Sequence, residues 1–364
     1  MAERKGKTGD PLRIAYVLTS LGVGGAEKQT LALAERMAAR GHKVMVVVMM
    51  AAGGEELETG LPVLRLNMVK TVKGIWKGAR FAGQFLSAFV PNVVHSHTFP
   101  ANMLARLMRL RGLRVPVVNT IHNVYEGGWH RRLLYRLSDG LAARVTAVSE
   151  AAAARYAGGS PVLVATNGVD VEAFRPERGR RKRVRREMGA GAGFVWLAVG
   201  RIAPAKDYAN LLGAFRRVRK AHADAELWIA GEGEPVRMQD GVRWLGLRAD
   251  VAELMEACDG FVMSSAWEGM PLALGEAMAM ERPVVATDVG GVRELMGDCG
   301  WLVRAKDSSA LAETMERVMG DGEREAMGKW ARARVVERFS RESRVGVWEG
   351  VYGGVRGRGS GIME

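Results

Sequence analysis

The sequence has 364 residues, of which 48% are hydrophobic, and this length suits two domains better than a single core. Its two cysteines, Cys258 and Cys299, exclude a disulfide framework and a cysteine-rich zinc site, so we expect buried apolar residues in a reducing cytosol. A formal net charge of +13 implies an anionic partner.

The chain contains no pattern typical of a signal peptide or a membrane span. Residues 1–7 are polar, and the longest apolar run, residues 44–52, is much shorter than the roughly 20 residues that cross a bilayer. We therefore expect a cytoplasmic protein, and we leave open a peripheral attachment to the inner face of the plasma membrane.

The first half of the chain alternates apolar β-type runs with segments of helical periodicity. Gly41 is expected to end the first helix. The continuously apolar runs indicate parallel strands that are buried on both faces. We predict strands at residues 12–19, 42–50, 93–95, 115–120 and 144–148, and helices at residues 26–40 and 100–111.

The same pattern starts again after a strongly basic run, residues 178–186, which we interpret as a solvated helix face. Strands are predicted at residues 194–199, 226–230, 242–245, 260–264 and 283–287, and helices at 208–222, 251–258 and 271–280. The fold class is therefore α/β, with two Rossmann-like domains. The predicted domains are residues 1–172 and 173–340, and residues 341–364 form a helix that packs back on the first domain, plus a tail.

Two segments follow first strands and are suited to phosphate. Gly24 and Gly25 lie in a turn that opens a helix, where backbone N–H groups can approach an anion. Glu27 stands where a dinucleotide-binding turn would have its third glycine, which disfavours that type of site. Arg201 and Lys206 follow the first strand of the second domain, and both can reach a pyrophosphate.

Two carboxylates flank a predicted turn from loop to helix. Glu268 belongs to the loop that contains Gly269 and Pro271, and Glu276 lies more than one turn inside the helix, in apolar surroundings. A carboxylate accepts two hydroxyl hydrogen bonds, so one acid could bind a sugar and the other a ribose. A buried acid also needs a partner.

Histidines and a basic segment complete the candidate set. His95 and His97 lie on one face of a strand end, and we expect core or cleft residues there because no third metal ligand is recognisable. The segment from Lys70 to Val90 is basic, aromatic and free of acids, so it is a candidate surface for an anionic membrane, with a helix solvated on its basic side as the alternative. No stacking surface or motif predicts nucleic-acid binding.

Taken in order, these motifs make the chain similar to the retaining glycosyltransferases of family 4 (glycosyl transferases group 1), which have the GT-B fold of two Rossmann-like domains facing across a cleft. The matching residues are Gly24-Gly25-Ala26-Glu27, His97, His122, Val148-Ser149-Glu150, Asn167-Gly168-Val169-Asp170, Val199-Gly200-Arg201 with Lys206, Trp244-Leu245-Gly246, and Glu268 to Glu276, which resembles the family's E-x7-E signature.

The resemblance implies a role for each matching residue. Arg201 and Lys206 would bind the donor diphosphate, Glu276 the ribose, and His122 would lie against the transferred sugar. Glu268 would lie near the sugar and the β-phosphate. Gly24 and Gly25 would meet the phosphate across the cleft. The remaining donor contacts would come from Leu245, Gly246 and Leu247 at the base and from Gly269, Met270, Pro271 and Leu272.

The function implied is a retaining, hexosyltransferase-type reaction of cell envelope polysaccharide biosynthesis. A UDP- or GDP-linked sugar would be the donor, a glycan or glycolipid the acceptor, and neither a metal nor another cofactor would take part. The alternatives are a non-catalytic sugar-nucleotide-binding module and an NAD(P)-dependent oxidoreductase. The chain departs from the family in short connections at residues 150–167 and 232–244, in Thr166 where proline is common, and in Gly275 beside Glu276.

Overall fold

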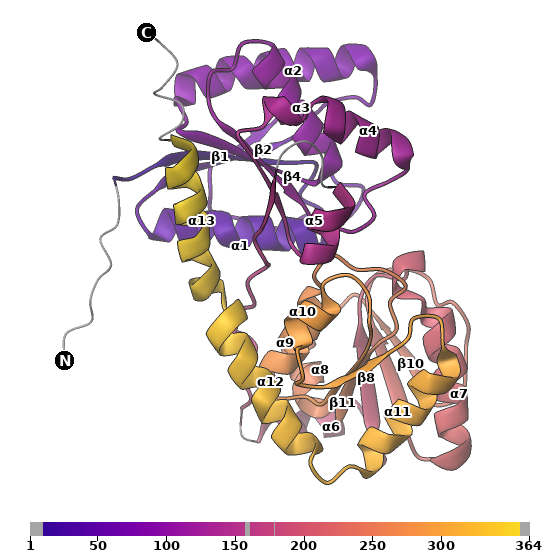
Figure 1. The fold of residues 1–364 in the computed structure, drawn as a ribbon. Helices are drawn as coiled ribbons and strands as arrows, with labels where there is room; N and C mark the ends of the chain where they lie inside the picture. The colour runs from indigo at the N-terminus through magenta and orange to yellow at the C-terminus, as the bar shows by residue number, and fades with distance from the viewer. Residues whose placement is uncertain (1–9, 157–160, 178, 357–364) are drawn as a thin grey trace, which may run out of the picture. The chain divides into compact units, whose positions relative to one another are not determined.

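The computed structural model describes residues 10–156, 161–177 and 179–356, and the chain divides into two units (Figure 1). Unit 1 contains the chain up to Thr166 and the segment that starts at Arg344, whereas unit 2 runs from Asn167 to Ser343. The domain boundaries predicted from the sequence lie between residues 172 and 173 and between residues 340 and 341, a few residues from these divisions. Residues 1–7, Arg178 and the tail after residue 356 lie outside the described residues, as does part of the connection at 150–167.

Unit 1 has a parallel sheet of seven strands in the order β3-β2-β1-β4-β5-β6-β7. The strand order changes direction between β1 and β4, which is where doubly wound sheets bind ligands. The strands are β1 (Arg13–Leu18), β2 (Lys43–Val48), β3 (Val63–Arg65), β4 (Val93–His97), β5 (Val117–Ile121), β6 (Arg144–Ala147) and β7 (Val162–Val164).

Helices cover both faces of this sheet. The core on one face joins β1 and β4 to α2 and α3, and the core on the other joins β1 to α1 and to α13, the last helix of the chain (Figure 1). The helices are α1 (Gly25–Ala39), α2 (Val72–Phe89), α3 (Thr98–Leu110), α4 (Trp129–Leu137), α5 (Glu150–Tyr156) and α13 (Arg341–Arg356), with a 3-10 turn η1 (Asp139–Leu141).

Unit 2 repeats this plan with six strands in the order β10-β9-β8-β11-β12-β13, and its change of direction lies between β8 and β11. The strands are β8 (Val195–Val199), β9 (Glu226–Ala230), β10 (Val242–Gly246), β11 (Gly260–Met263), β12 (Val284–Thr287) and β13 (Trp301–Val303). The helices are α6 (Arg180–Glu187), η2 (Pro204–Lys206), α7 (Tyr208–Ala221), α8 (Val251–Ala257), α9 (Leu272–Ala279), α10 (Val292–Met296), α11 (Ser308–Gly320) and α12 (Arg324–Phe339).

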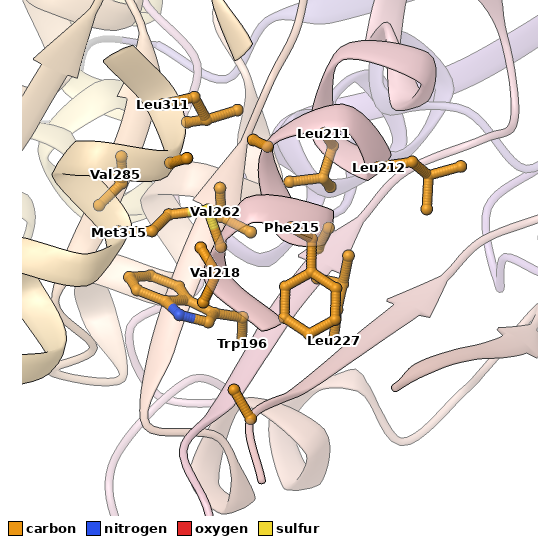
Figure 2. Close-up of a cluster of buried hydrophobic side chains, with 14 of the residues drawn as sticks. Trp196, Leu211, Leu212, Phe215, Val218, Leu227, Val262, Val285, Leu311 and Met315 are labelled. Atoms are coloured by element: carbon orange, nitrogen blue, oxygen red, sulfur yellow. The ribbon is translucent and has the colours of Figure 1, made fainter. Parts of the chain in front are cut away.

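The core of unit 2 follows from the helical spacing of apolar residues in α7. Leu211, Phe215 and Val218 recur every three or four residues and pack beside Trp196 of β8, together with side chains of α11 (Figure 2). Asp207 begins the helix, because its side chain accepts a hydrogen bond from the Asn210 N–H (3.3 Å).

The predicted elements are confirmed to within a few residues, and the predicted α/β fold class with two Rossmann-like domains is confirmed. The sequence analysis missed the three-residue strands β3, β7 and β13, which are too short to show a period, and the helices α4, α5, α10, α11 and α12. The segment at 232–244 contains no helix, as expected. Of the cysteines, Cys258 is buried and Cys299 is half-buried.

The interpretation of the basic run as a solvated face is wrong for two of its arginines. Arg181 and Arg185 both bind the Asp259 carboxylate, at 2.5 and 2.9 Å, and both also donate to the Ala257 carbonyl. The end of α8 leaves carbonyl groups without helical partners, and arginines supply the missing donors. None of the helices in the described ranges is long and apolar enough to cross a membrane.

Candidate functional site

The carboxyl end of β8 is anchored tightly to the end of β9. A Cβ atom on Gly231 would collide with the Gly200 carbonyl oxygen, so the two strand ends approach as closely as glycine permits. The Tyr208 hydroxyl donates to the same carbonyl at 2.7 Å. The segment from Arg201 to Lys206 therefore starts from a fixed point at the change in strand order.

The two predicted cations of this segment have different surroundings. Arg201 is exposed, and among the described residues it makes no hydrogen bond or ion pair. Lys206 ends the 3-10 turn η2, and its Nζ lies 2.6 Å from Oε1 of Glu268. The structure thus brings Lys206 and Glu268 together, and it leaves the Arg201 guanidinium available to an anion.

Glu268 is 8% exposed and is held in one orientation. Its Oε1 accepts hydrogen bonds from Lys206 and from the Ser265 hydroxyl (2.7 Å), whereas Oε2 has no partner among the described residues. Since Oε2 remains open, Glu268 can accept a hydrogen bond from a hydroxyl group of a ligand. The sequence analysis missed Ser265 as a site residue. Its position only three residues before Glu268, in the same loop, could have indicated it.

Glycines after β12 support the loop that contains Glu268. Gly290 has φ +54°, and a Cβ atom there would collide with the Glu268 carbonyl oxygen. The Gly291 N–H donates to the Gly269 carbonyl at 2.8 Å. The sequence analysis missed this support because nothing in the sequence assigns Gly290 to that loop.

The loop leads into α9, which starts at Leu272 and has no side-chain cap. Met270 is fixed by Asn167, whose Nδ2 donates to the Met270 carbonyl (3.1 Å). The N–H groups of the first turn of α9 lack helical partners, as those of any helix do, and they are suited to phosphate. Glu276 lies in the second turn, half-buried, as its position in the sequence predicts.

Close packing explains why the residue before Glu276 is a glycine. A Cβ atom on Gly275 would lie 2.6 Å from Cγ2 of Val169. The absence of a side chain therefore lets α9 pack against the segment that begins unit 2. The glycine at position 275, which departs from the family pattern, is therefore explained by this close contact with Val169.

The segment predicted to bind a base lies along the same sheet edge. Leu245 and Gly246 end β10 and Leu247 follows it, and Gly246 has φ +65° and accepts a hydrogen bond at its carbonyl from the Gly231 N–H (2.8 Å). Because all six strands are parallel, the ends of β10, β9, β8 and β11 form one continuous edge. The predicted base, diphosphate and sugar positions thus follow one another along it.

Unit 1 contains the remaining predicted residues. Gly24 and Gly25 follow β1 and start α1, but a Cβ atom on Gly24 would meet the carboxylate of Glu27, which lies in the first turn. An anion at this helix end would therefore lie near a carboxylate. His122 follows β5, two strands from β1 in the sheet order.

Three histidines lie next to one another in unit 1, of which His95 and His97 are buried and His122 is half-buried. His122 Nε2 lies 2.9 Å from His97 Nδ1, while His95 contacts the Tyr352 hydroxyl (2.8 Å) and the Thr120 hydroxyl (2.7 Å). His95 is thus a core residue, which is one of the two positions, core or cleft, that the sequence predicts for it. Burial lowers the pKa of His122 to about 4, so this ring is neutral near pH 7. Within the described ranges, no group of three or more candidate ligands could hold a metal ion.

Comparisons with known proteins show the family of the chain and support its fold. Residues 193–321 match the family model described as glycosyl transferases group 1, and residues 23–173 match that of glycosyltransferase family 4. Alpha-maltose-1-phosphate synthase of Mycolicibacterium smegmatis is 30% identical over 297 residues, which cover 70% of this chain and 76% of the relative.

A second relative is the UDP-Gal:alpha-D-GlcNAc-diphosphoundecaprenol alpha-1,3-galactosyltransferase of Escherichia coli, which is 26% identical over 72% of this chain and 75% of its own. Among solved structures, HepE of Anabaena in complex with UDP-glucose superposes with a TM-score of 0.80 at 20% identity, covering 94% of this chain and all of that one. At this identity the likeness shows the fold alone.

Proposed function

Because the chain belongs to the group 1, family 4 glycosyltransferases, we propose that it transfers a hexosyl group from a UDP- or GDP-linked sugar to a glycan or glycolipid acceptor. The observation that carries this proposal is the edge of the second sheet, where Arg201, the Lys206–Glu268 pair and the start of α9 follow one another. These groups match the charge of a nucleoside diphosphate and the hydroxyls of a sugar.

The chemistry follows from the charge that develops during the reaction. Departure of the leaving diphosphate builds negative charge, which Arg201, Lys206 and the N–H groups of α9 would stabilise without a metal ion. Oε1 of Glu268 already accepts two hydrogen bonds, which favours a role in holding Lys206 and a sugar hydroxyl over a role as nucleophile. We therefore expect front-face attack on the anomeric carbon, with retention.

The test is a panel of UDP-, GDP- and ADP-sugars, in which the melting temperature and the release of nucleoside diphosphate are measured with and without EDTA. Stabilisation with slow, EDTA-insensitive release supports the transferase. Stabilisation without release under any acceptor supports the binding module, and stabilisation by NAD(P) alone contradicts the proposal.

A matched pair of variants connects the result to the site. Arg201→Ala should weaken donor binding by about 10- to 100-fold, since a charged hydrogen bond contributes about 1.5–3 kcal/mol. Arg216→Ala removes an exposed arginine of α7 on the same unit and should leave donor binding unchanged. Equal donor affinity in both variants would remove Arg201 from the site.

The acceptor side of the proposal includes an anionic membrane surface, and α2 supports it. This helix exposes Trp76, Phe81 and Phe85 beside Lys73, Lys77 and Arg80, with no acidic residue from 59 to 125. The E. coli relative acts, by its name, on a diphosphoundecaprenol-linked sugar. Exposed aromatic and basic side chains on one helix suit the boundary of an anionic bilayer.

A second helix of unit 1 has the same character. In α4, Trp129 and Leu137 are 71% and 76% exposed, and the helix includes Arg132 and Arg136 but no acid. Simultaneous contact of α2 and α4 with one bilayer would bind the membrane more strongly than either helix alone.

Liposome sedimentation tests this part of the proposal. The protein should pellet with anionic vesicles at low salt and much less with neutral ones. Lys73→Glu combined with Lys77→Glu should abolish pelleting, whereas Arg216→Glu combined with Arg217→Glu, on exposed positions of α7, should not. Equal recovery with anionic and neutral vesicles would contradict a membrane role.

A further inference from the structure

The half-buried carboxylate of Glu126 holds the loop that contains His122, and the proposed function does not use it. Glu126 accepts a hydrogen bond at Oε1 from the His122 main-chain N–H (2.8 Å) and one at Oε2 from the Tyr135 hydroxyl (2.8 Å). One side chain thus joins the end of β5 to the buried residue of α4.

The main chain of Glu126 is fixed as well. Its N–H donates to the Tyr156 hydroxyl (2.7 Å), and its carbonyl accepts a hydrogen bond from the Arg131 guanidinium (2.6 Å). Gly127, the next residue, has φ +126°, which only glycine adopts without strain. All four polar groups of Glu126 are therefore bonded, and the loop has one well-defined conformation.

The second partner of the carboxylate is itself held by the sheet. Nδ2 of Asn102 donates to the Tyr135 hydroxyl (2.9 Å) and to the Thr120 carbonyl (3.0 Å), and the Ser96 hydroxyl donates to Oδ1 of Asn102 (2.8 Å). These contacts connect Glu126 to β4, β5 and α3. These hydrogen bonds therefore fix the position of the His122 main chain relative to the strands and the helix, and not only relative to the loop.

We propose that Glu126 is a positioning residue, which fixes the main chain of His122 so that its ring and backbone meet the transferred sugar. This inference rests on the proposed function, in which His122 lies against that sugar. The ring is already held on one side by His97, and Glu126 supplies the hold on the main chain. Without Glu126, the His122 N–H and the Tyr135 hydroxyl both lose their acceptor, and the loop can relax.

The test compares Glu126→Ala, Glu126→Gln and an exposed control, Glu55→Ala. An error of about 1 Å at a reacting group can lower a rate by about 100-fold, and we expect a loss of that order in kcat for Glu126→Ala. The donor KM should change little, because Arg201 and Lys206 belong to unit 2. Glu126→Gln keeps an acceptor for the His122 N–H and should recover most of the kcat.

A second readout does not depend on turnover. The protein has six histidines, so the ring signals of a 15N-histidine-labelled sample can be assigned with a His122→Gln variant. Glu126→Ala should shift the His122 and His97 ring signals, and Glu55→Ala should not. If the wild-type enzyme consumes no donor, the proposed function fails, but these spectra still decide the positioning role.

Two results would overturn the inference. The first is a folded Glu126→Ala protein with unchanged His122 ring signals and a kcat within about twofold of the wild type. If that variant does not fold, Tyr135→Phe removes the second contact of the carboxylate, together with the hydrogen bond from Asn102, and should lower kcat by about 10-fold. A wild-type kcat in Tyr135→Phe, together with unshifted His122 signals, would then be the overturning result.

Discussion

Gly275→Ala separates helix propensity from packing at the candidate donor site. Glycine inside a helix usually costs about 1 kcal/mol relative to alanine, so the substitution alone should stabilise α9. However, the new methyl group would lie 2.6 Å from Cγ2 of Val169, well inside the 3.5–4.0 Å separation of carbon atoms in contact. The sign depends on whether Val169 can move.

The surroundings of Val169 indicate that it cannot move easily. Its side chain is 2% exposed and β-branched, and its main chain donates to Phe339 (2.7 Å) and accepts from Arg341 (2.9 Å). Overpacking of this kind costs about 1–3 kcal/mol. We therefore expect a net loss of about 1 kcal/mol, and a displacement of α9 that weakens donor binding through Glu276.

Urea unfolding at equilibrium measures this loss, with Gly83→Ala as the matched control. Gly83 lies inside α2 with no atom near its missing Cβ, so this control should stabilise the protein by about 0.5–1 kcal/mol. The double variant Gly275→Ala with Val169→Ala should recover part of the loss, which a double-mutant cycle quantifies. A Gly275→Ala protein more stable than the wild type would refute the packing argument.

Three further predictions address the two units separately. Ser265→Ala removes one of two donors to Oε1 of Glu268, and we expect about a 10-fold lower kcat in nucleoside diphosphate release, with about 1 kcal/mol lower stability. Tyr352→Phe leaves the Tyr16 hydroxyl and His95 Nδ1 without their buried partner and should cost about 3 kcal/mol in a denaturant titration, whereas Tyr125→Phe, at an exposed position, should be neutral. Burial raises the pKa of Glu126 from 4.5 to about 7, so the folded state binds its proton more tightly and this contribution to stability is lost as the pH rises through 7. Between pH 5 and pH 8, Glu126→Gln should therefore gain stability relative to the wild type by an amount on the order of 3 kcal/mol in paired melts, and a constant difference would show that Glu126 does not titrate there.

The sequence was most informative where charged side chains come directly after a parallel strand. Arg201, Lys206 and Glu268 could be placed at one sheet edge because β8 and β11 are apolar, carry β-type residues and end at recognisable loops. The contact between Lys206 and Glu268 depends on β8 and β11 being neighbours in the sheet, which doubly wound topology makes the default. The position of Glu276 inside a helix followed from Pro271 and the apolar spacing.

Contacts between distant segments could not be predicted in the same way. His95 and Tyr352 are 257 residues apart, and no local pattern connects them. The network around Glu126 depends on a loop without periodicity, although Glu126 is the first acid after a long acid-free stretch, which was a usable signal. Arg181 and Arg185 looked like solvated charges because the partner they bind, Asp259, lies more than 70 residues further along the chain.

The return of α13 to unit 1 has a consequence for the order of folding during synthesis. Unit 2 is a continuous segment and can fold when its last residue has left the ribosome. Unit 1 needs Trp348 and Tyr352 to complete its core, and these residues are synthesised after the whole of unit 2. Unit 1 is therefore finished after unit 2, and until then α1 alone covers this face of its sheet and leaves apolar side chains that a chaperone could bind.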